Sequence, residues 1–373
     1  MALNYNNLTA LTRDKFIPVL VDNIFNSNVL TFKLLKNAEK LDGGKKIITP
    51  IEYGKNASQG FYSGYDTLTT ANTEIVTSAE WDWTQAWAGI TISGEEEHKN
   101  MGDSQVLSLL KSKLKNAEKS LKDLFGTHLF DTDGPNTGAF TSLIGSGTQA
   151  SSAYDDTALI DMADGNSTAF WHSPGGVNNS IISYNRTLGG IDSTEDGSAG
   201  NGGAWWDSKM ASFATGSDVV TTACTWDELI AVTNGTAHII KKMTQMYSEL
   251  TIDNDAPDLI VTTNVIYDAY ESALQANKRF AGNQQLADAG FQNLAFRGAS
   301  VVVDSHCPDG MMIFLNTRYL DFKVHNKRNF SFDGFKKRED SDAMVAKIFW
   351  MGQLTCTNPR MQGAIVGGPS AYA

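Results

Sequence analysis

The chain has 373 residues, enough for two or three compact units, because one hydrophobic core usually serves about 100–200 residues. Hydrophobic residues make up 41% of the chain and charged residues 19%, a globular composition that excludes wholesale disorder. The formal net charge of −12 argues against a protein that binds nucleic acid through a general basic surface.

The three cysteines, Cys224, Cys307 and Cys356, are odd in number and far apart in the sequence. We therefore expect reduced, buried thiols rather than disulfides or a zinc site. The first residues lack a basic start and an apolar stretch, which predicts no signal peptide. No apolar run approaches the roughly 18–20 residues that span a bilayer, so we expect a soluble protein made in a cytoplasm, without a membrane partner.

Residues 1–42 are polar and irregular, and we expect an N-terminal arm there. A short helix is predicted near Val19–Phe25, and the rest of the arm is expected to be extended. The apolar residues of the arm are too few to form a core, so their burial needs a neighbouring chain or the underside of the long helix described below. We expect contacts between subunits at Phe16, Leu20 and Phe25, with docking of the arm on its own domain as the alternative.

Residues 43–94 predict a long β-hairpin. One strand covers Lys46–Tyr53, where Pro50 favours an edge position. The returning strand covers Ile75–Trp87, and a period of two places on one face Ala79, Trp81, Trp83 and Trp87. A hairpin this long, ahead of any core-sized domain, has too little nearby apolar surface to bury both faces. We therefore expect other copies of the same chain to cover it, as in a shell subunit.

The connection Gly54–Asn72 is too long for a tight hairpin turn. It carries three aromatic residues that predict a contact site, Phe61, Tyr62 and Tyr65. The alternative is a loop folded back on its own core.

The segment Asp103–Gly126 predicts a long amphipathic helix, with Asp103 or Ser104 as its cap and Gly126 at its end. Leucines recur at intervals of three and four residues, and five lysines fill other positions: Lys111, Lys113, Lys115, Lys119 and Lys122. Such a lysine face is usually solvated. The other interpretation is a face toward acidic neighbours or packaged nucleic acid.

Glycine, serine, threonine and asparagine dominate residues 131–216, which predicts short strands, such as Ser180–Tyr184, and long surface loops. A compact α/β unit follows. Its predicted elements are a helix from Thr225 through Tyr247, strand Leu259–Thr262, a helix near Val265–Asn277, and strands Ser300–Asp304, Met311–Asn316 and Tyr319–Val324. The chain then predicts one long strand, or two joined, at Ala343–Cys356, and a short apolar piece at Ala364–Val366.

No arrangement of chemical groups indicates catalysis. Glu95, Glu96 and Glu97 precede the long helix, where carboxylates favour the positive end of the helix dipole. The six histidines show no metal-ligand spacing. His306 and Cys307 are adjacent, and on a strand their side chains would point to opposite faces. We therefore expect no enzyme, no cofactor and no metal.

Four segments in order carry a resemblance to a known family: Pro257–Asn264, Phe296–Asp304, Phe314–Asn316 and Cys356–Pro359. They show a strand followed by asparagine and a helix, then glycine with an apolar strand and aspartate, then Leu-Asn. Together with the segments before them, they resemble the major capsid proteins of tailed bacteriophages with the Hong Kong 97-type fold, over nearly the whole chain.

This resemblance implies an α+β fold in five parts. They are an N-terminal arm (1–42), an extended β-hairpin loop (43–94), a peripheral domain with a spine helix and the glycine-rich insertion (95–222), an axial α/β domain (223–335), and a C-terminal return to the peripheral domain (336–373).

The resemblance also implies pentamers and hexamers joined into an icosahedral shell around double-stranded DNA, assembled in a host bacterial cytoplasm and present in the virion. It also implies a portal and a scaffolding function. The sequence departs from some relatives in two ways. It has no long helical segment ahead of the arm, so we expect a separate scaffolding protein, and its extra glycine-rich stretch, 131–216, is expected to contact a neighbour or a decoration protein. DNA contact is expected to be weak and non-specific. It would occur at basic residues on the inner surface: Arg13, Lys15, Lys33 and the five lysines of the spine helix.

Two alternatives remain. One is the shell of an encapsulin-like nanocompartment, which shares the fold. The other is a β-rich enzyme or glycan-binding module, in which the exposed tryptophans Trp81, Trp83 and Trp87 stack on sugars.

Overall fold

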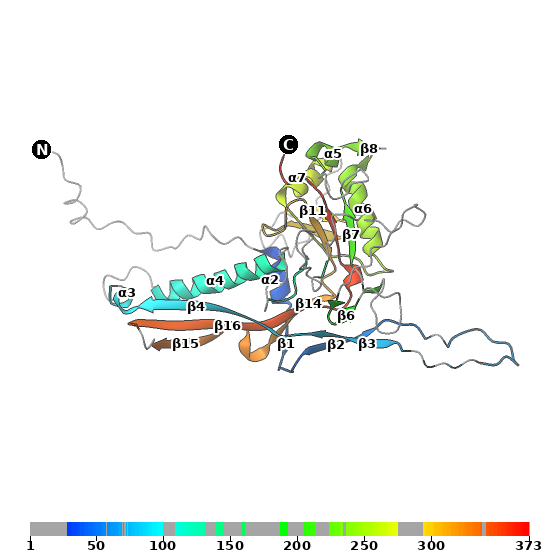
Figure 1. Cartoon of the computed structure of the whole chain (residues 1–373). Helices are drawn as coiled ribbons and strands as arrows, with labels where there is room; N and C mark the ends of the chain where they lie inside the picture. Colours follow the sequence, from blue (N-terminus) through cyan, green and yellow to red (C-terminus); the bar gives the residue numbers. More distant parts are fainter. Residues whose placement is uncertain are drawn as a thin grey trace. The chain divides into compact units, whose positions relative to one another are not determined.

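The structure, a computed structural model, is shown in Figure 1. It describes residues 28–56, 58–68, 70, 72, 74–99, 109–130, 139–144, 159–160, 187–192, 205–206, 208–213, 224–233, 236–274, 294–337 and 341–372. The chain divides into two compact units. The smaller unit includes Trp87–Asp123 and Phe330–Phe349, and the larger unit includes Ser27–Ala86, Leu124–Asn329 and Trp350–Ala373.

A six-stranded sheet forms the core of the larger unit. Its order is β11 (Leu294–Phe296), β12 (Ala299–Val303), β10 (Leu259–Thr262), β13 (Met312–Leu315), β17 (Gly363–Val366) and β7 (Lys209–Ser212). β10 runs parallel to β12 and β7 parallel to β17, while the other neighbours are antiparallel. The central strands β10 and β13 are buried at every residue, as expected of strands covered on both faces. The strands predicted in this region are confirmed within one or two residues.

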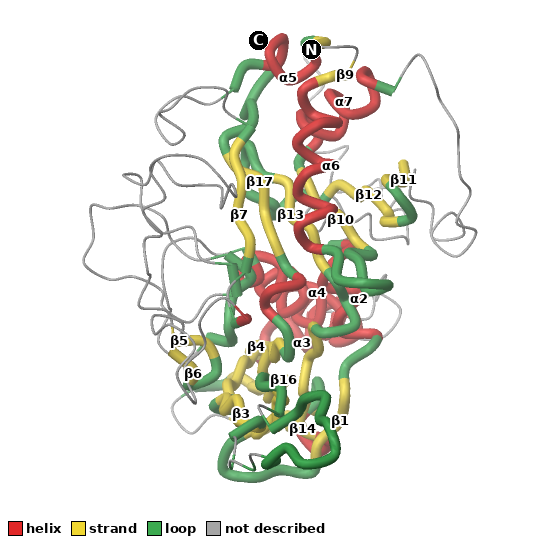
Figure 2. Tube along the Cα trace, turned by 90° about the vertical axis from the view of Figure 1, so that its right-hand side faces the viewer, coloured by secondary structure: helices red, strands yellow, loops and turns green. Residues whose placement is uncertain are grey.

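Two helices, α6 (His238–Leu250) and α7 (Asn264–Ala273), pack on this sheet in the larger unit, and α5 (Trp226–Ile230) packs against both of them (Figure 2). α6 buries one stripe at helical spacing, formed by Ile239, Met243, Met246 and Leu250. These side chains share one apolar cluster with Ile260 and Phe314 of the sheet. Burial of this helical stripe therefore holds α6 on the sheet.

The predicted single helix from Thr225 to Tyr247 is wrong. Thr225 caps α5 as predicted, and Glu228 completes a capping box, with its carboxylate accepting from the Thr225 N–H at 2.9 Å. However, a pair of two-residue strands, β8 (Val232–Thr233) and β9 (Thr236–Ala237), separates α5 from α6. β-Branched residues at three of these four positions disfavour a continuous helix.

The long strand predicted at Ala343–Cys356 is confirmed as β16, with the same bounds. In the larger unit it pairs antiparallel with β14 (Leu320–His325), which pairs in parallel with β1 (Glu39–Leu41). In the smaller unit it pairs antiparallel with β15 (Ser331–Lys337). β4 (Thr84–Ser93) pairs with β16 as well. Two 3-10 turns, η4 (Asn326–Arg328) and η5 (Pro359–Met361), complete this part of the chain.

The predicted long helix is present as α4 (Leu109–Leu129), which lies alongside β4 and β16 in the smaller unit (Figure 1). Its predicted cap at Asp103 or Ser104 falls outside the described residues. The predicted end at Gly126 is wrong, because the helix continues to Leu129. The three glutamates predicted to precede this helix lie instead in a short helix of their own, α3 (Gly94–Lys99).

A helix that the sequence analysis expected to be extended chain is α2 (Val29–Lys36). The side chain of Asn28 caps it by accepting from the Thr31 N–H at 3.3 Å. Leu30 and Leu34, four residues apart, are buried. The capping asparagine and this spacing were visible in the sequence. The helix predicted at Val19–Phe25 lies outside the described residues.

The predicted hairpin is real but shorter than expected. β2 (Ile47–Glu52) and β3 (Val76–Trp81) pair antiparallel over six residues each. The predicted continuous strand from Ile75 to Trp87 is wrong, because Asp82 and Trp83 interrupt it between β3 and β4. The Trp83 indole N–H donates to the Gly44 carbonyl at 3.0 Å, and the Thr84 hydroxyl donates to the Gly352 carbonyl at 2.5 Å. These two bonds lie where the pairing changes: β3, before them, pairs with β2, and β4, which begins at Thr84, pairs with β16.

Of the glycine-rich stretch 131–216, the described strands are β5 (Thr187–Leu188), β6 (Ile191–Asp192) and β7. The strand predicted at Ser180–Tyr184 lies outside the described residues. The three cysteines are free and buried, as predicted. Burial raises the pKa of the Cys224 thiol to about 11, which keeps it protonated and unreactive.

Candidate assembly surface

The loop 53–75 continues the β2–β3 hairpin well beyond its strands in the larger unit (Figure 1). It presents three aromatic side chains, named here the aromatic tip: Phe61, Tyr62 and Tyr65. Their relative exposures are 111%, 69% and 105%. Leu68 in the same loop, which the sequence analysis did not single out, is also exposed. The alternative of a loop folded back on its own core is therefore wrong for these side chains.

The aromatic tip is held by a local turn. The Ser63 N–H donates to the Asp66 carboxylate at 2.8 Å, and the Asp66 N–H donates back to the Ser63 carbonyl at 2.7 Å. These two bonds close a β-turn with Tyr65 inside it. A Cβ atom built on Gly60 or Gly64 would meet nothing within 4 Å among the described atoms. The loop therefore exposes apolar side chains, while two local hydrogen bonds hold its backbone in a turn.

The spine helix α4 pairs part of its lysine face with its own unit. Lys113 Nζ donates to the Glu96 carboxylate at 2.7 Å and to the Thr91 carbonyl at 2.9 Å. The hydrogen bond from Lys113 lowers the pKa of Glu96. Ala117 and Leu121, four and eight residues after Lys113, are buried. Lys115 and Lys122 are exposed, Lys119 is half-buried, and the side chain of Lys111 lies outside the described part.

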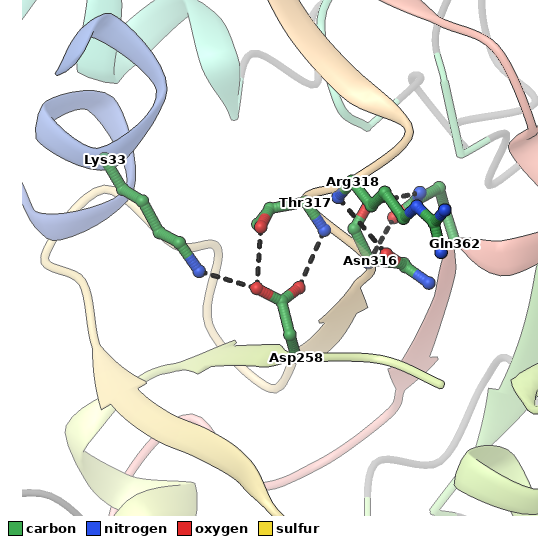
Figure 3. A network of polar contacts seen from close by, with 6 residues as sticks. All are labelled: Lys33, Asp258, Asn316, Thr317, Arg318 and Gln362. Atoms are coloured by element: carbon green, nitrogen blue, oxygen red, sulfur yellow. Dashed lines mark hydrogen bonds and ion pairs between the residues drawn. The ribbon is translucent and has the colours of Figure 1, made fainter. Parts of the chain in front are cut away.

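Lys33 on α2 binds its own chain in the larger unit (Figure 3). Its Nζ lies 2.7 Å from the carboxylate of Asp258, which also accepts from the Thr317 N–H at 2.7 Å and the Thr317 hydroxyl at 2.6 Å. Burial alone raises the pKa of Asp258, but the hydrogen bonds from Lys33 and Thr317 outweigh it and leave this pKa lowered. These bonds join α2 to the strand end at β10, a contact that no local sequence signal predicts.

The same network is extended by a pair of amides. The Asn316 N–H donates to the Gln362 side-chain oxygen at 2.9 Å, and the Gln362 amide donates to the Asn316 carbonyl at 3.0 Å. Both side chains are buried. The Asn316 that follows β13, singled out by the sequence resemblance, therefore has a structural partner on the C-terminal part of the chain.

Solved structures share this arrangement over nearly the whole chain. A capsid asymmetric unit of cyanophage A-1(L) has a TM-score of 0.60 at 14% identity and covers 98% of this chain and 99% of that chain. The capsid of an empty GTA particle has a TM-score of 0.57 at 8% identity, with 97% of each chain covered. A structure from Mycobacterium phage Bobi has a TM-score of 0.53 at 11% identity and covers 99% of this chain and 100% of that chain. No protein-family model and no curated protein matches the sequence.

The chain has the fold of a tailed-phage major capsid protein. The α+β fold and the resemblance predicted from the sequence are confirmed. At these identities the likeness concerns the fold, and the division into five parts stays a prediction. The loop that bears the aromatic tip lies within the range predicted for the extended loop, and α4 overlaps the range predicted for the spine helix.

The structure brings together only part of the predicted contact set. The three residues of the aromatic tip share one loop, as expected. The arm residues Phe16, Leu20 and Phe25 lie outside the described residues, as do Arg13 and Lys15. Which surface of a shell the spine-helix lysines face also stays a prediction.

The tryptophans proposed for sugar stacking do not form an exposed set. Trp81 is 4% exposed, and Trp83 is half-buried, with its ring 5.8 Å from that of His325 in an edge contact. Trp87 is exposed, and the ammonium of Lys347 lies 5.9 Å from the centroid of the Trp87 ring. The expectation that all three are exposed on one strand face is therefore wrong, because the strand breaks between Trp81 and Thr84.

His306 and Cys307 lie in a turn. The expectation that they lie on a strand, with side chains on opposite faces, is therefore wrong. The His306 ring contacts the Asn28 amide at 3.3 Å and lies 3.5 Å from the carboxylate of Asp304. The Cys307 thiol instead faces the Met311 carbonyl at 3.9 Å. Burial raises the pKa of Cys307. The two side chains therefore have different partners.

Within the described ranges, no helix has the length and apolar character to cross a bilayer. No group of three or more His, Cys, Asp or Glu side chains in the same ranges is arranged to hold a metal ion.

Proposed function

We propose that this chain is the structural subunit that self-assembles into the icosahedral head of a tailed phage and encloses its double-stranded DNA. The observation that carries this proposal is the exposed aromatic tip, on a chain with the capsid fold over nearly its whole length. Burying one large apolar side chain contributes about 1.5–3 kcal/mol. Three of them in one loop therefore favour association with another molecule.

The partner proposed for the aromatic tip is another copy of the same chain. In a shell every subunit both offers a loop and receives one, so the contact repeats at every interface. Pentamers and hexamers of such subunits supply these repeated contacts. The loop needs a substantial interface, because ordering its backbone costs roughly 1–2 kcal/mol per residue.

Contact with packaged DNA is proposed to be weak and non-specific. The chain carries a net charge of −12, so positive potential must be local. Lys33 and Lys113 already bind carboxylates of their own chain. The exposed Lys115 and Lys122 of the spine helix are therefore the best candidates among the described residues. Binding through a few lysines falls steeply with added salt.

The remaining partners follow from the same proposal. A head that fills with DNA needs a portal, and its assembly uses a separate scaffolding protein. A decoration protein would bind the outer surface. Assembly takes place in the cytoplasm of the bacterial host, and the finished protein belongs to the virion.

The first prediction tests the aromatic tip by substitution. The triple variant Phe61→Ser, Tyr62→Ser, Tyr65→Ser is expected to melt like the wild-type subunit, because these side chains are mostly exposed. It is expected to lose particle formation, measured by sedimentation and negative-stain imaging. The control is Val232→Ser, which removes an apolar side chain as exposed as Tyr62 from strand β8.

Particles of the triple variant at wild-type yield would contradict the proposal. Nuclease-resistant DNA inside particles from infected cells supports a phage head, whereas particles that hold an enzyme cargo instead would support the nanocompartment.

A further inference from the structure

The base of the extended loop is buried on one face although its hairpin has only two strands. In the register of β2 and β3, Ile47 lies opposite Trp81 and Thr49 opposite Ala79. Ile47, Ala79 and Trp81 are all buried, whereas the opposite face, with Ile48 and Val76, is exposed. An isolated two-stranded hairpin is marginally stable in water. Another segment of the chain must therefore cover the buried face.

That segment is the β5–β6 turn, from the middle of the glycine-rich stretch. The Glu80 N–H on β3 donates to the Gly189 carbonyl at 2.7 Å. Gly189 and Gly190 have φ values of +60° and +76°, as a type I′ hairpin turn requires. A Cβ atom on Gly189 would lie 2.9 Å from Trp81 Cζ2 and 3.0 Å from Ala79 Cβ. The turn thus fits against β3 only because residue 189 has no side chain.

Two tryptophans from the same stretch support this contact. Trp206 is fully buried, and its indole N–H donates to the Leu188 carbonyl at 3.0 Å. The Trp205 ring stacks on Tyr53, the first residue after β2, with centroids 5.2 Å apart and planes 18° apart. One tryptophan therefore holds the β5–β6 turn, and its neighbour holds the start of the extended loop.

We infer that the β5–β6 turn together with Trp205 and Trp206, named here the insertion clamp, fixes the base of the extended loop on its own subunit before assembly. This role in assembly rests on the proposed function. A loop fixed at its base has fewer orientations to lose when its tip binds a neighbour, so the clamp favours binding by preorganisation. The described part of the glycine-rich stretch thus contacts its own subunit, and the expected contact of this stretch with a neighbour or a decoration protein stays a prediction.

The second prediction uses two adjacent glycines as a matched pair. Asparagine tolerates positive φ, so Gly189→Asn and Gly190→Asn place similar strain on the turn. Only Gly189→Asn places a Cβ against Trp81. A Cβ on Gly190 would meet no described atom within 4 Å. Amide hydrogen exchange is measured on the full-length unassembled chain, and assembly yield is measured in parallel.

In Gly189→Asn we expect the β2–β3 amides, Glu80 above all, to exchange about tenfold faster or more, the factor that 1.4 kcal/mol makes in an opening equilibrium. Assembly yield is expected to fall with it. Gly190→Asn is expected to match the wild type in both measurements. Trp206→Phe, which loses the bond to Leu188 and part of the buried packing of the indole, is also expected to speed the exchange of the same amides.

Unchanged exchange in Gly189→Asn would overturn the clamp, whatever happens to assembly. Faster exchange with wild-type assembly would overturn its role in positioning the loop. If the wild-type chain itself never assembles, the proposed function fails, while the exchange comparison still decides whether the clamp exists.

Discussion

At the scale of single residues, the ion pair between Lys33 and Asp258 has a measurable signature. The pKa of Asp258 is lowered in the folded chain, so the folded state binds fewer protons there than the unfolded state. The stability from this group is present above the unfolded pKa of about 3.9 and is lost as pH falls through the lower folded pKa. The contribution is modest, since both side chains are partly exposed.

The third prediction follows from the lowered pKa of Asp258. Asp258→Asn is expected to lower the free energy of unfolding at neutral pH, and its difference from the wild type is expected to shrink as pH falls below about 4. Lys33→Gln should show a smaller loss with the same trend. Urea denaturation followed by tryptophan fluorescence measures this difference at each pH. A difference that stays constant between pH 7 and pH 3 would contradict the assignment.

At the scale of elements, α2 and α4 meet at a glycine in the larger unit. A Cβ atom on Gly126 would collide with the side-chain nitrogen of Asn28, the residue that caps α2. It would also lie 3.2 Å from the His306 ring. Glycine inside a helix costs about 1 kcal/mol relative to alanine. Here it allows the cap of one helix to approach the backbone of the other, which explains why the sequence places at residue 126 a glycine that does not end the helix.

The fourth prediction is a change of sign in a double-mutant cycle. Gly126→Ala alone is expected to destabilise the chain by about 1 kcal/mol, because the new methyl group displaces Asn28 from its cap. In an Asn28→Ala background the cap is already lost, so the same substitution is expected to be neutral or stabilising. Both effects are measured by urea denaturation. The same destabilisation in both backgrounds would show that the two helices are not coupled through this contact.

The elements that the sequence predicts well carry their signals locally. β10, β13 and β16 are apolar runs between turn residues, and the capping box at Thr225 is read from four adjacent residues. The residues around the break at Trp83 bond to Gly44 and Gly352, and Gly126 leaves room for Asn28, all of them distant in sequence. Such contacts leave no periodic pattern, and for this reason local reasoning missed them.

The candidate assembly surface was likewise predictable from the sequence only where the signal is local. The aromatic tip could be predicted because aromatic residues in a long polar loop have no nearby core. The contact between Gly189 and Trp81 joins residues more than a hundred positions apart, and the glycine pair at 189–190 signals a turn without naming its partner. The Lys33–Asp258 pair spans 225 positions and was equally invisible.

At the scale of the whole molecule, the described part of the chain gains no stability from disulfides or metal clusters. Under the proposed function, the exposed aromatic tip is buried in the assembled state, in which contacts between copies add to the stability of each subunit. The same reasoning applies to the N-terminal arm. Removal of Met1–Phe25 would then weaken particles more than it weakens free subunits.

The fifth prediction concerns the central claim, that this chain builds a closed shell. Electron microscopy of the purified full-length protein, with its mass measured by sedimentation, tests the claim most directly. We predict closed icosahedral particles in which copies of this chain form pentamers and hexamers joined through the extended loops. A protein that stays monomeric at every concentration and salt condition tested, with its aromatic tip intact, would contradict the account.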